Sequence, residues 1–238
     1  MRLDKLLSEA GLGSRKELKK LIKSGRVTLN GSAAVRPEMQ VDAQADEVCL
    51  DGERVRYSRF HYYMMDKPTG VLTATRDSKQ STVLDLLPEQ LRRMGLFPVG
   101  RLDKDTSGLL LLTDDGDFAH RVISPKFCVE KMYYARVEGE LGQKDAEAFA
   151  QGLTLRDGTR CLPARLELIG RDECRVTVRE GKYHQVRRVL ASRGAPVLGL
   201  RRLTVGELAL RDDSAAGEIR ELDENDLCRV FKNKNAEK

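Results

Sequence analysis

Short segments with strand character recur from residue 61 onward and outnumber the helical ones. Helical periodicity in this region is confined mainly to residues 143–151 and 184–193. This pattern is typical of an α+β domain built on a largely antiparallel sheet. The sequence contains no G-x-G-x-x-G, P-loop or internal repeat, so nucleotide-binding and solenoid folds are not indicated. The expected strands are 61–65, 70–75, 108–113, 132–138, 164–169, 173–179 and 197–200.

The first 55 or so residues predict a separate, smaller unit. Apolar side chains repeat at helical spacing over residues 3–10, and Gly11 ends the pattern. Ser14 and Glu17 carry the signature of a capping box, which begins a second helix that Gly25 ends. The segments "RVTLNGSAAV" and "DEVCLDGERV" each predict two short strands around an Asn-Gly or Asp-Gly turn.

Positive charge gathers on one face of that second helix. Residues 1–36 hold nine Lys/Arg and three Asp/Glu, whereas the remaining residues sum to −1. A face of one sign repels itself unless a phosphate backbone meets it, although a purely solubilising face is the alternative. Because residues 1–56 contain no aromatic side chain, we expect nucleic-acid binding by shape and phosphate contacts rather than by stacking. The expected contacts are Arg15, Lys16, Lys19, Lys20 and Lys23.

Composition argues against several classes of protein. Hydrophobic residues make up 40% of the 238, which is enough for a core. No apolar run reaches the roughly 18 residues that span a bilayer, and the N-terminus lacks the apolar stretch of a signal peptide. The five cysteines contain no C-x-x-C, and the three histidines are scattered, which favours free thiols and no metal site. We therefore expect a cytoplasmic protein.

The stretch "GRLDKDTSGLLLL", residues 100–112, places two carboxylates ahead of four leucines. Asp103 and Asp105 fit the first positions of a calcium loop, but Pro98 and Gly100 break the helix that such a loop needs before it. A glycosidase pair is disfavoured because alternate residues of a strand point to opposite faces. A structural turn, with Asp103 paired to Arg101, stays open.

A second polar cluster lies in "EGKYHQVRRVL", residues 180–190, ahead of an apolar helical face. Arg187, at the start of this helix and facing inward, needs a buried carboxylate, and Asp103 would supply one. The guanidinium would in turn favour the ionised form of the carboxylate. In "EKMYYARV", residues 130–137, Tyr133 offers an aromatic face for a base taken out of its stack.

These motifs resemble those of the RsuA-type ribosomal RNA pseudouridine synthases, and the resemblance covers the whole chain. The first 55 residues look like the alpha-L RNA-binding module, the S-four type. The motifs that match in order and approximate spacing are "MDKPTG" (65–70), "GRLDKDTSGLLLLTDDG" (100–116), "EKMY" (130–133) and "EGKYHQVRR" (180–188).

The resemblance implies an α+β chain with two domains. An alpha-L RNA-binding domain would occupy residues 1–56, followed by a linker at 57–60. A catalytic domain of the pseudouridine synthase fold, a mostly antiparallel mixed sheet with flanking helices, would occupy 61–231. Residues 232–238 would form a disordered basic tail.

The resemblance also assigns roles to residues. Asp103 aligns with the essential aspartate, Arg187 with its basic partner, and Tyr133 with the tyrosine that packs against the target base. Arg187 stands where several relatives have lysine, and Asp66 stands where the family often has asparagine, which puts a role for the Asp66 side chain in doubt. The expected RNA contacts of this domain are Arg101, Lys131, Lys182, His184 and Arg202.

The implied reaction is the isomerisation of uridine within RNA, which needs no cofactor. The expected partner is small-subunit 16S ribosomal RNA or a ribosomal subunit assembly intermediate, bound by a monomer. The alternatives are a synthase for large-subunit 23S RNA, a catalytically inactive RNA-binding protein, and a hydrolytic glycosylase that would release uracil.

Overall fold

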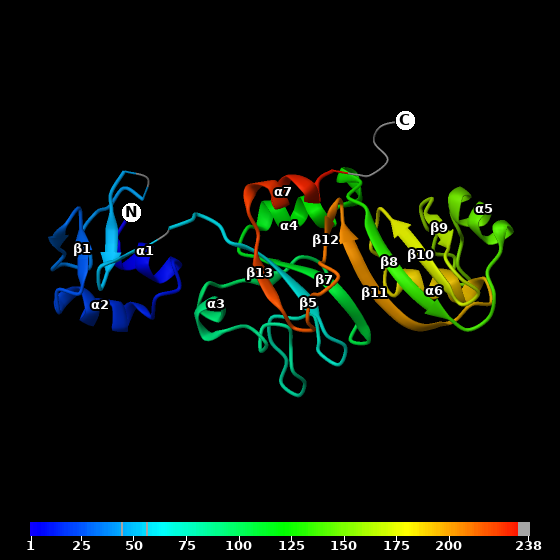
Figure 1. Ribbon diagram of the computed structural model, residues 1–238, viewed down its shortest axis with the longest axis horizontal. Helices are drawn as coiled ribbons and strands as arrows, with labels where there is room; N and C mark the ends of the chain where they lie inside the picture. Colours follow the sequence, from blue (N-terminus) through cyan, green and yellow to red (C-terminus); the bar gives the residue numbers. More distant parts are fainter. Residues whose placement is uncertain (44, 56, 233–238) are drawn as a thin grey trace. The chain divides into compact units, whose positions relative to one another are not determined.

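Two units make up the chain in Figure 1, a computed structural model. The first unit comprises Met1–His61 and Leu84–Leu96, and the second comprises Tyr62–Val83 and the chain from Phe97 onward. The structure describes residues 1–43, 45–55 and 57–232.

The domain boundaries expected from the sequence, with a linker at 57–60, stay predictions. The first unit also contains residues 84–96, a segment that no sequence signal assigned to it. The expected disordered tail lies, apart from Lys232, outside the described residues.

The first unit follows its sequence signals closely. The backbone N–H of Ser14 donates to Glu17 Oε2 over 2.8 Å, and Ser14 Oγ accepts from the Glu17 N–H, so the expected capping box is present. Asn30 and Gly31 adopt φ values of 50° and 81°, which a tight hairpin turn requires at both central positions. The four strands order as β2-β1-β3-β4. The elements are α1 (Leu3–Glu9), α2 (Arg15–Lys23), β1 (Val27–Leu29), β2 (Ser32–Ala33), β3 (Val48–Leu50), β4 (Glu53–Arg54) and α3 (Glu89–Arg93).

The second unit is built on one mixed sheet, as the sequence predicts. Within the described residues it has nine strands, seven of which run in the order β13-β5-β7-β11-β8-β10-β9, with β12 paired to β11 and β6 to β7. The pair β7–β11 is parallel and the other pairs are antiparallel. The strands are β5 (Tyr62–Lys67), β6 (Phe97–Pro98), β7 (Thr106–Thr113), β8 (Lys131–Val137), β9 (Arg165–Leu168), β10 (Glu173–Val178), β11 (Val197–Val205), β12 (Leu208–Ala209) and β13 (Ile219–Glu221).

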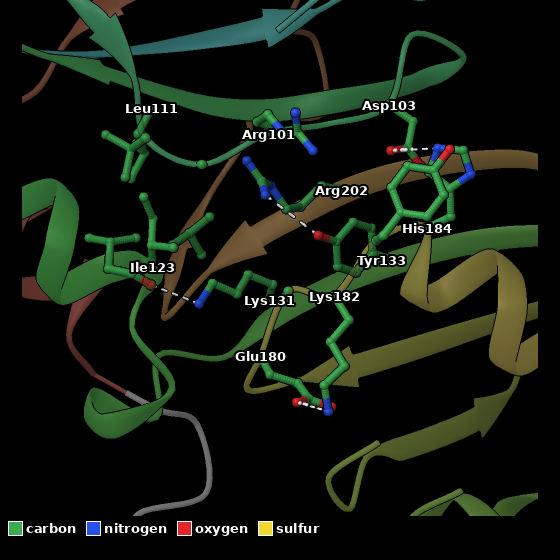
Figure 2. Close-up of a pocket in the computed structure, with 16 residues that line it drawn as sticks. Arg101, Asp103, Leu111, Ile123, Lys131, Tyr133, Glu180, Lys182, His184 and Arg202 are labelled. Atoms are coloured by element: carbon green, nitrogen blue, oxygen red, sulfur yellow. Dashed lines mark hydrogen bonds and ion pairs between the residues drawn. The ribbon is translucent and has the colours of Figure 1, made fainter. Parts of the chain in front are cut away.

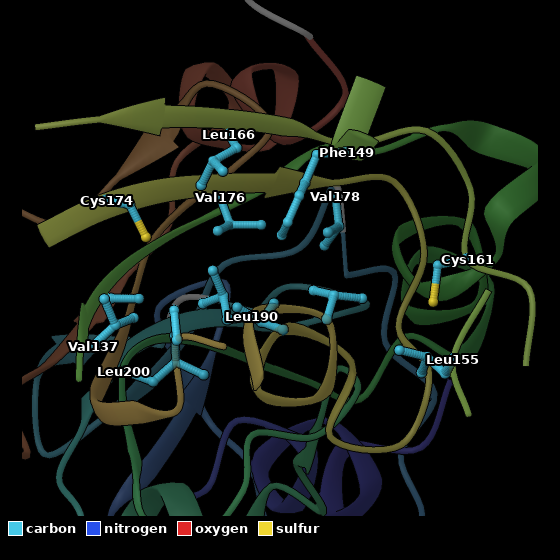
Figure 3. Packing of buried hydrophobic residues seen from close by; sticks show 14 residues of the cluster. Val137, Phe149, Leu155, Cys161, Leu166, Cys174, Val176, Val178, Leu190 and Leu200 are labelled. Carbon is cyan, nitrogen blue, oxygen red and sulfur yellow. The ribbon is translucent and has the colours of Figure 1, made fainter. Parts of the chain in front are cut away.

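Helices lie at both ends of this sheet. Helices α4 and α7 lie beside each other near β12, while α5 and α6 lie with β8, β9 and β10 at the other end (Figure 1). In Figure 3, Val176 and Val178 of β10 point toward Leu190 of α6, in a cluster of apolar side chains that fixes this helix on the sheet. The helices of this unit are α4 (Gly116–Ile123), α5 (Gln143–Gln151), α6 (Gln185–Ser192) and α7 (Glu224–Val230), with a 3-10 turn, η1, at Pro125–Phe127.

The expected strand at 70–75 is wrong. Leu72 makes one isolated bridge to Thr82, and the segment is fixed instead by a side chain. Thr73 Oγ1 donates to the Leu102 carbonyl over 2.7 Å and accepts from the Leu102 N–H over 3.2 Å. The segment therefore braces the loop before Asp103 rather than extending the sheet.

The sequence analysis did not predict helices α3, α4 and α7. Helix α4 begins directly after Asp114 and Asp115, where the chain turns out of β7. The Asp115 side chain accepts from the N–H groups of Asp117 and Phe118, so this turn is also a helix N-cap. No helix within residues 1–43, 45–55 and 57–232 is long and apolar enough to cross a membrane.

Candidate active site

Asp103 lies in the loop between β6 and β7, and Arg187 reaches it from the first turn of α6. Arg187 Nε is 3.8 Å from Asp103 Oδ2, and Arg187 Nη2 is 3.0 Å from Asp105 Oδ2. The structure thus brings together the two residues that the sequence paired. The expectation of a buried carboxylate is wrong, because the Asp103 side chain is 27% exposed. A carboxylate that acts on a bound substrate has to face an opening.

Lys67 holds the loop that carries Asp103. Its side chain is completely buried, and Nζ donates to the carbonyl oxygens of Pro68 at 3.0 Å, Asp103 at 3.2 Å and Thr106 at 3.0 Å. Burial lowers the pKa of Lys67 to about 8, although the nearby Asp103 and Asp105 carboxylates oppose this shift. One ammonium group therefore ties the backbone at and after the aspartate to the end of β5.

A pocket of about 260 Å³ opens beside Asp103 (Figure 2). Its size suits a single nucleoside rather than a base pair. The polar side chains of its wall include Arg101, Asp103, Glu180, Lys182 and His184. The apolar side chains are Val99, Leu111, Val122, Ile123 and Val205.

Three side chains from two adjacent strands meet in this pocket. Lys131 and Tyr133 are two residues apart on β8 and share a face, and Arg202 of β11 lies directly opposite Tyr133. Arg202 Nη1 is 3.5 Å from the Tyr133 hydroxyl, and Lys131 Nζ donates to the Val122 carbonyl over 2.8 Å. The ring of Tyr133 is half-buried, which leaves it available to a flat ligand.

The remaining expected contacts differ in their surroundings. His184 adopts the left-handed conformation, with φ 48° and ψ 32°, as the N-cap of α6, and its Nε2 is 3.4 Å from Asp103 Oδ1. Its ring stacks on Tyr183 at 3.9 Å between centroids. Lys182 Nζ forms an ion pair with the buried Glu180 over 2.8 Å, so part of its charge is compensated by the protein. Arg101 is exposed at the pocket wall.

The cations of the first unit lie on the open face of α2. Leu18 and Ile22 are fully buried against α1 and the small sheet, whereas the basic side chains project into solvent. The exposed residues are Arg15, Lys16, Lys19, Lys20 and Lys23.

Comparisons with known proteins show which family the chain belongs to. Residues 61–192 match the family model described as RNA pseudouridylate synthase, and residues 1–48 match the S4 domain. The chain belongs to the RNA pseudouridylate synthase family. It is 44% identical to an uncharacterized RNA pseudouridine synthase of Bacillus subtilis, over 95% of this chain and 97% of the relative.

Two further likenesses cover nearly the whole chain. It is 41% identical to the ribosomal small subunit pseudouridine synthase A of Vibrio cholerae, over 98% of this chain and all of the relative. A crystal structure of a pseudouridylate synthase superposes with a TM-score of 0.68 at 32% identity, over 97% of this chain and 99% of that one. The enzyme is therefore an RNA pseudouridine synthase, an isomerase, with an S4 RNA-binding domain.

Sequence reasoning missed two features of this synthase. Lys67 was quoted only within the motif "MDKPTG", although a lysine two residues after the apolar run "YYMM" is itself a signal of a buried, bonded ammonium. Gly108 was not given a role in the site. A Cβ at Gly108 would lie 2.2 Å from the Arg202 carbonyl oxygen, so this glycine allows β11 to pair closely beside β7 and places Arg202 at the pocket.

Proposed function

We propose that this synthase converts a uridine of small-subunit ribosomal RNA to pseudouridine, with Asp103 as the essential carboxylate. The observation that carries the proposal is the pocket of nucleoside size with Asp103 in its wall. The small-subunit substrate is supported by the name of the Vibrio cholerae relative, which matches over its full length.

The chemistry follows from where the side chains lie. A uridine turned out of the RNA would place its ring against Tyr133, with the ribose at the loop of Asp103. Asp103 would act on the ribose or on the ring, while Arg187 and His184, which both lie within 4 Å of its carboxylate oxygens, orient it. The N1–C1′ bond would break, the uracil would turn within the pocket, and the C5–C1′ bond would form. C5 loses a proton and N1 gains one, so the product is an isomer of the substrate.

The apolar wall has a part in this scheme. Once the glycosidic bond is broken, water must not reach the sugar, or the enzyme would become a glycosylase. The side chains of Val99, Leu111 and Val205 line the pocket and offer water no hydrogen bonds. We expect the bound RNA to close the open side.

The S4 domain would supply affinity. The exposed cations of α2 would meet phosphates, which carry no direct base information, while the catalytic domain selects the uridine. We further propose that the protein acts as a monomer in the cytoplasm, on ribosomal RNA or on an assembly intermediate.

The test is to map pseudouridine in ribosomal RNA from cells with and without this gene, and to repeat the conversion with purified enzyme. The loss of one modified position in small-subunit RNA would support the proposal. Loss of a modified position from large-subunit RNA would indicate that large-subunit RNA is the substrate. Release of free uracil would indicate a glycosylase, and unchanged maps would indicate an RNA-binding protein without activity.

A further inference from the structure

Two cations in the wall of the pocket are buried. Lys131 is 8% exposed and Arg202 is 5% exposed, yet both line the pocket. They come from the neighbouring strands β8 and β11, on the face of the sheet that also carries Tyr133. In Figure 2 the Lys131 side chain extends toward Ile123, and the Arg202 guanidinium lies near the Tyr133 hydroxyl.

Neither cation has a carboxylate partner within 4.0 Å among the residues that the structure describes. Lys131 Nζ donates to the Val122 carbonyl, and Arg202 Nε donates to the Leu109 carbonyl over 2.7 Å. The other lysine of the pocket wall, Lys182, faces Glu180, and Arg101 of the same wall is exposed to solvent rather than buried.

An uncompensated buried charge destabilises a fold, so two of them side by side need an explanation. Each also disfavours the other, and after burial the nearby Arg202 charge is the next cause that lowers the pKa of Lys131. Besides these backbone contacts, Arg202 Nη1 lies 3.5 Å from the Tyr133 hydroxyl, and both side chains line the pocket. The expected ligand at this point is an anion.

We propose that Lys131 and Arg202 form an anion site that stabilises the negative charge on the uracil ring during the reaction. The proposal rests on the proposed isomerisation. When the N1–C1′ bond breaks, its electron pair stays on N1 and spreads to O2 and O4. If Asp103 instead attacks the ring, the charge collects at O4. Every route open to Asp103 thus makes the ring oxygens negative, and preorganised cations lower the barrier.

A phosphate of the RNA is the other anion that could use this site. The neighbouring wall favours the ring, because Val122 and Ile123 lie beside Lys131 and Leu111 lies across the pocket. A strongly hydrated phosphate gains nothing from such apolar contacts, whereas the flat faces of uracil do. The uracil oxygens would therefore point to the cations while its faces contact Tyr133 and the aliphatic side chains.

The test compares two substrates in single turnover, an RNA with uridine at the target position and the same RNA with 5-fluorouridine. Fluorine withdraws electrons and stabilises the ring anion without help from the protein. We expect Lys131→Met and Arg202→Met each to slow uridine consumption by about 100-fold, the usual effect of removing one charge-stabilising donor. The loss on 5-fluorouridine should be at least about tenfold smaller, RNA affinity should change little, and Lys131→Arg should recover much of the rate.

Arg201→Met is the matched control. Arg201 is the neighbour of Arg202 on β11, and its Nη2 is 2.5 Å from the buried Asp66. Its loss should lower stability and slow both substrates equally. Equal slowing of both substrates by Lys131→Met would overturn the anion site, and so would a loss confined to RNA affinity, which would indicate a phosphate. A wild-type enzyme without activity on any ribosomal RNA would overturn the isomerisation itself and this inference with it.

Discussion

Arg187 lies closer to Asp105 than to Asp103, at 3.0 Å against 3.8 Å. Its buried Nε, the atom nearest to Asp103, has no hydrogen-bond partner among the described residues. The structure therefore leaves Asp103 within reach of a cation but not locked to it. A carboxylate that must also touch a ribose or a base has to be free of such a lock. Contacts of this kind often shorten only when substrate binds.

The first prediction concerns the carboxylate itself. Asp103→Asn should abolish conversion of uridine, because the amide keeps the shape of the side chain and removes its charge. RNA binding should stay within a few-fold of wild type. Residual turnover above about a hundredth of wild type would remove Asp103 from the chemistry, since loss of an essential group costs several orders of magnitude.

Asp105→Asn is the control for that variant. Asp105 forms the shorter ion pair with Arg187, but its side chain is 69% exposed, so the pair contributes little stability. We expect a modest loss of rate, through a less ordered Arg187, and an unchanged melting temperature. Equal loss in the Asp103 and Asp105 variants would indicate that the loop is needed as a whole.

The second prediction concerns Arg187. Arg187→Ala should lower turnover strongly, because it removes the cation beside Asp103. Its effect on folding should be below the roughly 3–5 kcal/mol of a fully buried pair, because Asp103 is partly exposed. Arg187→Lys should retain more activity than the alanine variant. Activities that are the same in the two variants would show that charge at this position does not matter.

The third prediction concerns Lys67, which holds the loop that carries Asp103. Lys67→Met preserves the length of the side chain and leaves buried carbonyl oxygens, including those of Asp103 and Thr106, without a donor. Each such group costs roughly 1–3 kcal/mol, so we expect a clear loss of unfolding free energy together with a loss of turnover. Urea unfolding and turnover measured on the same preparation would check this. Full stability with full activity would contradict the bracing role.

The fourth prediction concerns the S4 domain. Replacing Lys16, Lys19, Lys20 and Lys23 with glutamine should weaken RNA binding and flatten its salt dependence. Removing one lysine–phosphate interaction lowers the slope of log K against log salt by about 0.7 to 0.9. Since these side chains are exposed, folding should survive, and the modified uridine should stay the same. A binding series in salt and a product map are the measurements. An unchanged slope would remove α2 from the interface.

The fifth prediction concerns alkaline pH. Burial, with a further contribution from Arg202 of β11 and an opposing one from Cys128, lowers the pKa of Lys131 from 10.5 to about 8. Turnover should therefore fall above pH 8 as the cation is lost. The contribution of this group to the unfolding free energy should instead rise with pH. Between the two pKa values the unfolded chain holds a proton that the folded chain has released.

Lys131→Arg is the control for the pH profile, because arginine keeps its charge. Lys67 also has a pKa of about 8, so this variant should still lose part of its turnover at alkaline pH. A pH profile identical to that of the wild type would indicate that other groups cause the whole loss of turnover at alkaline pH.

Local sequence signals were sufficient to predict many of the elements and the class of site. The capping box of Ser14 and Glu17, the turn at Asn30-Gly31 and the helix over 143–151 could be predicted because each depends on neighbouring residues. The family was also recognisable, since its motifs are short and ordered. The same local reading failed at residues 70–75, where a hydrogen bond to another part of the chain fixes the conformation.

The tertiary structure decides which of the predicted cations lie next to each other in the sheet. In the sequence, Lys131 and Arg202 look like two more RNA contacts. Although they are 71 positions apart, they meet on adjacent strands and are buried with no carboxylate partner among the described residues. Lys67 likewise becomes a brace only once β5 and β7 pair and bring the carbonyl oxygens of the Asp103 loop to its ammonium group. Burial and strand register determine these relationships, and neither is a property of any short segment.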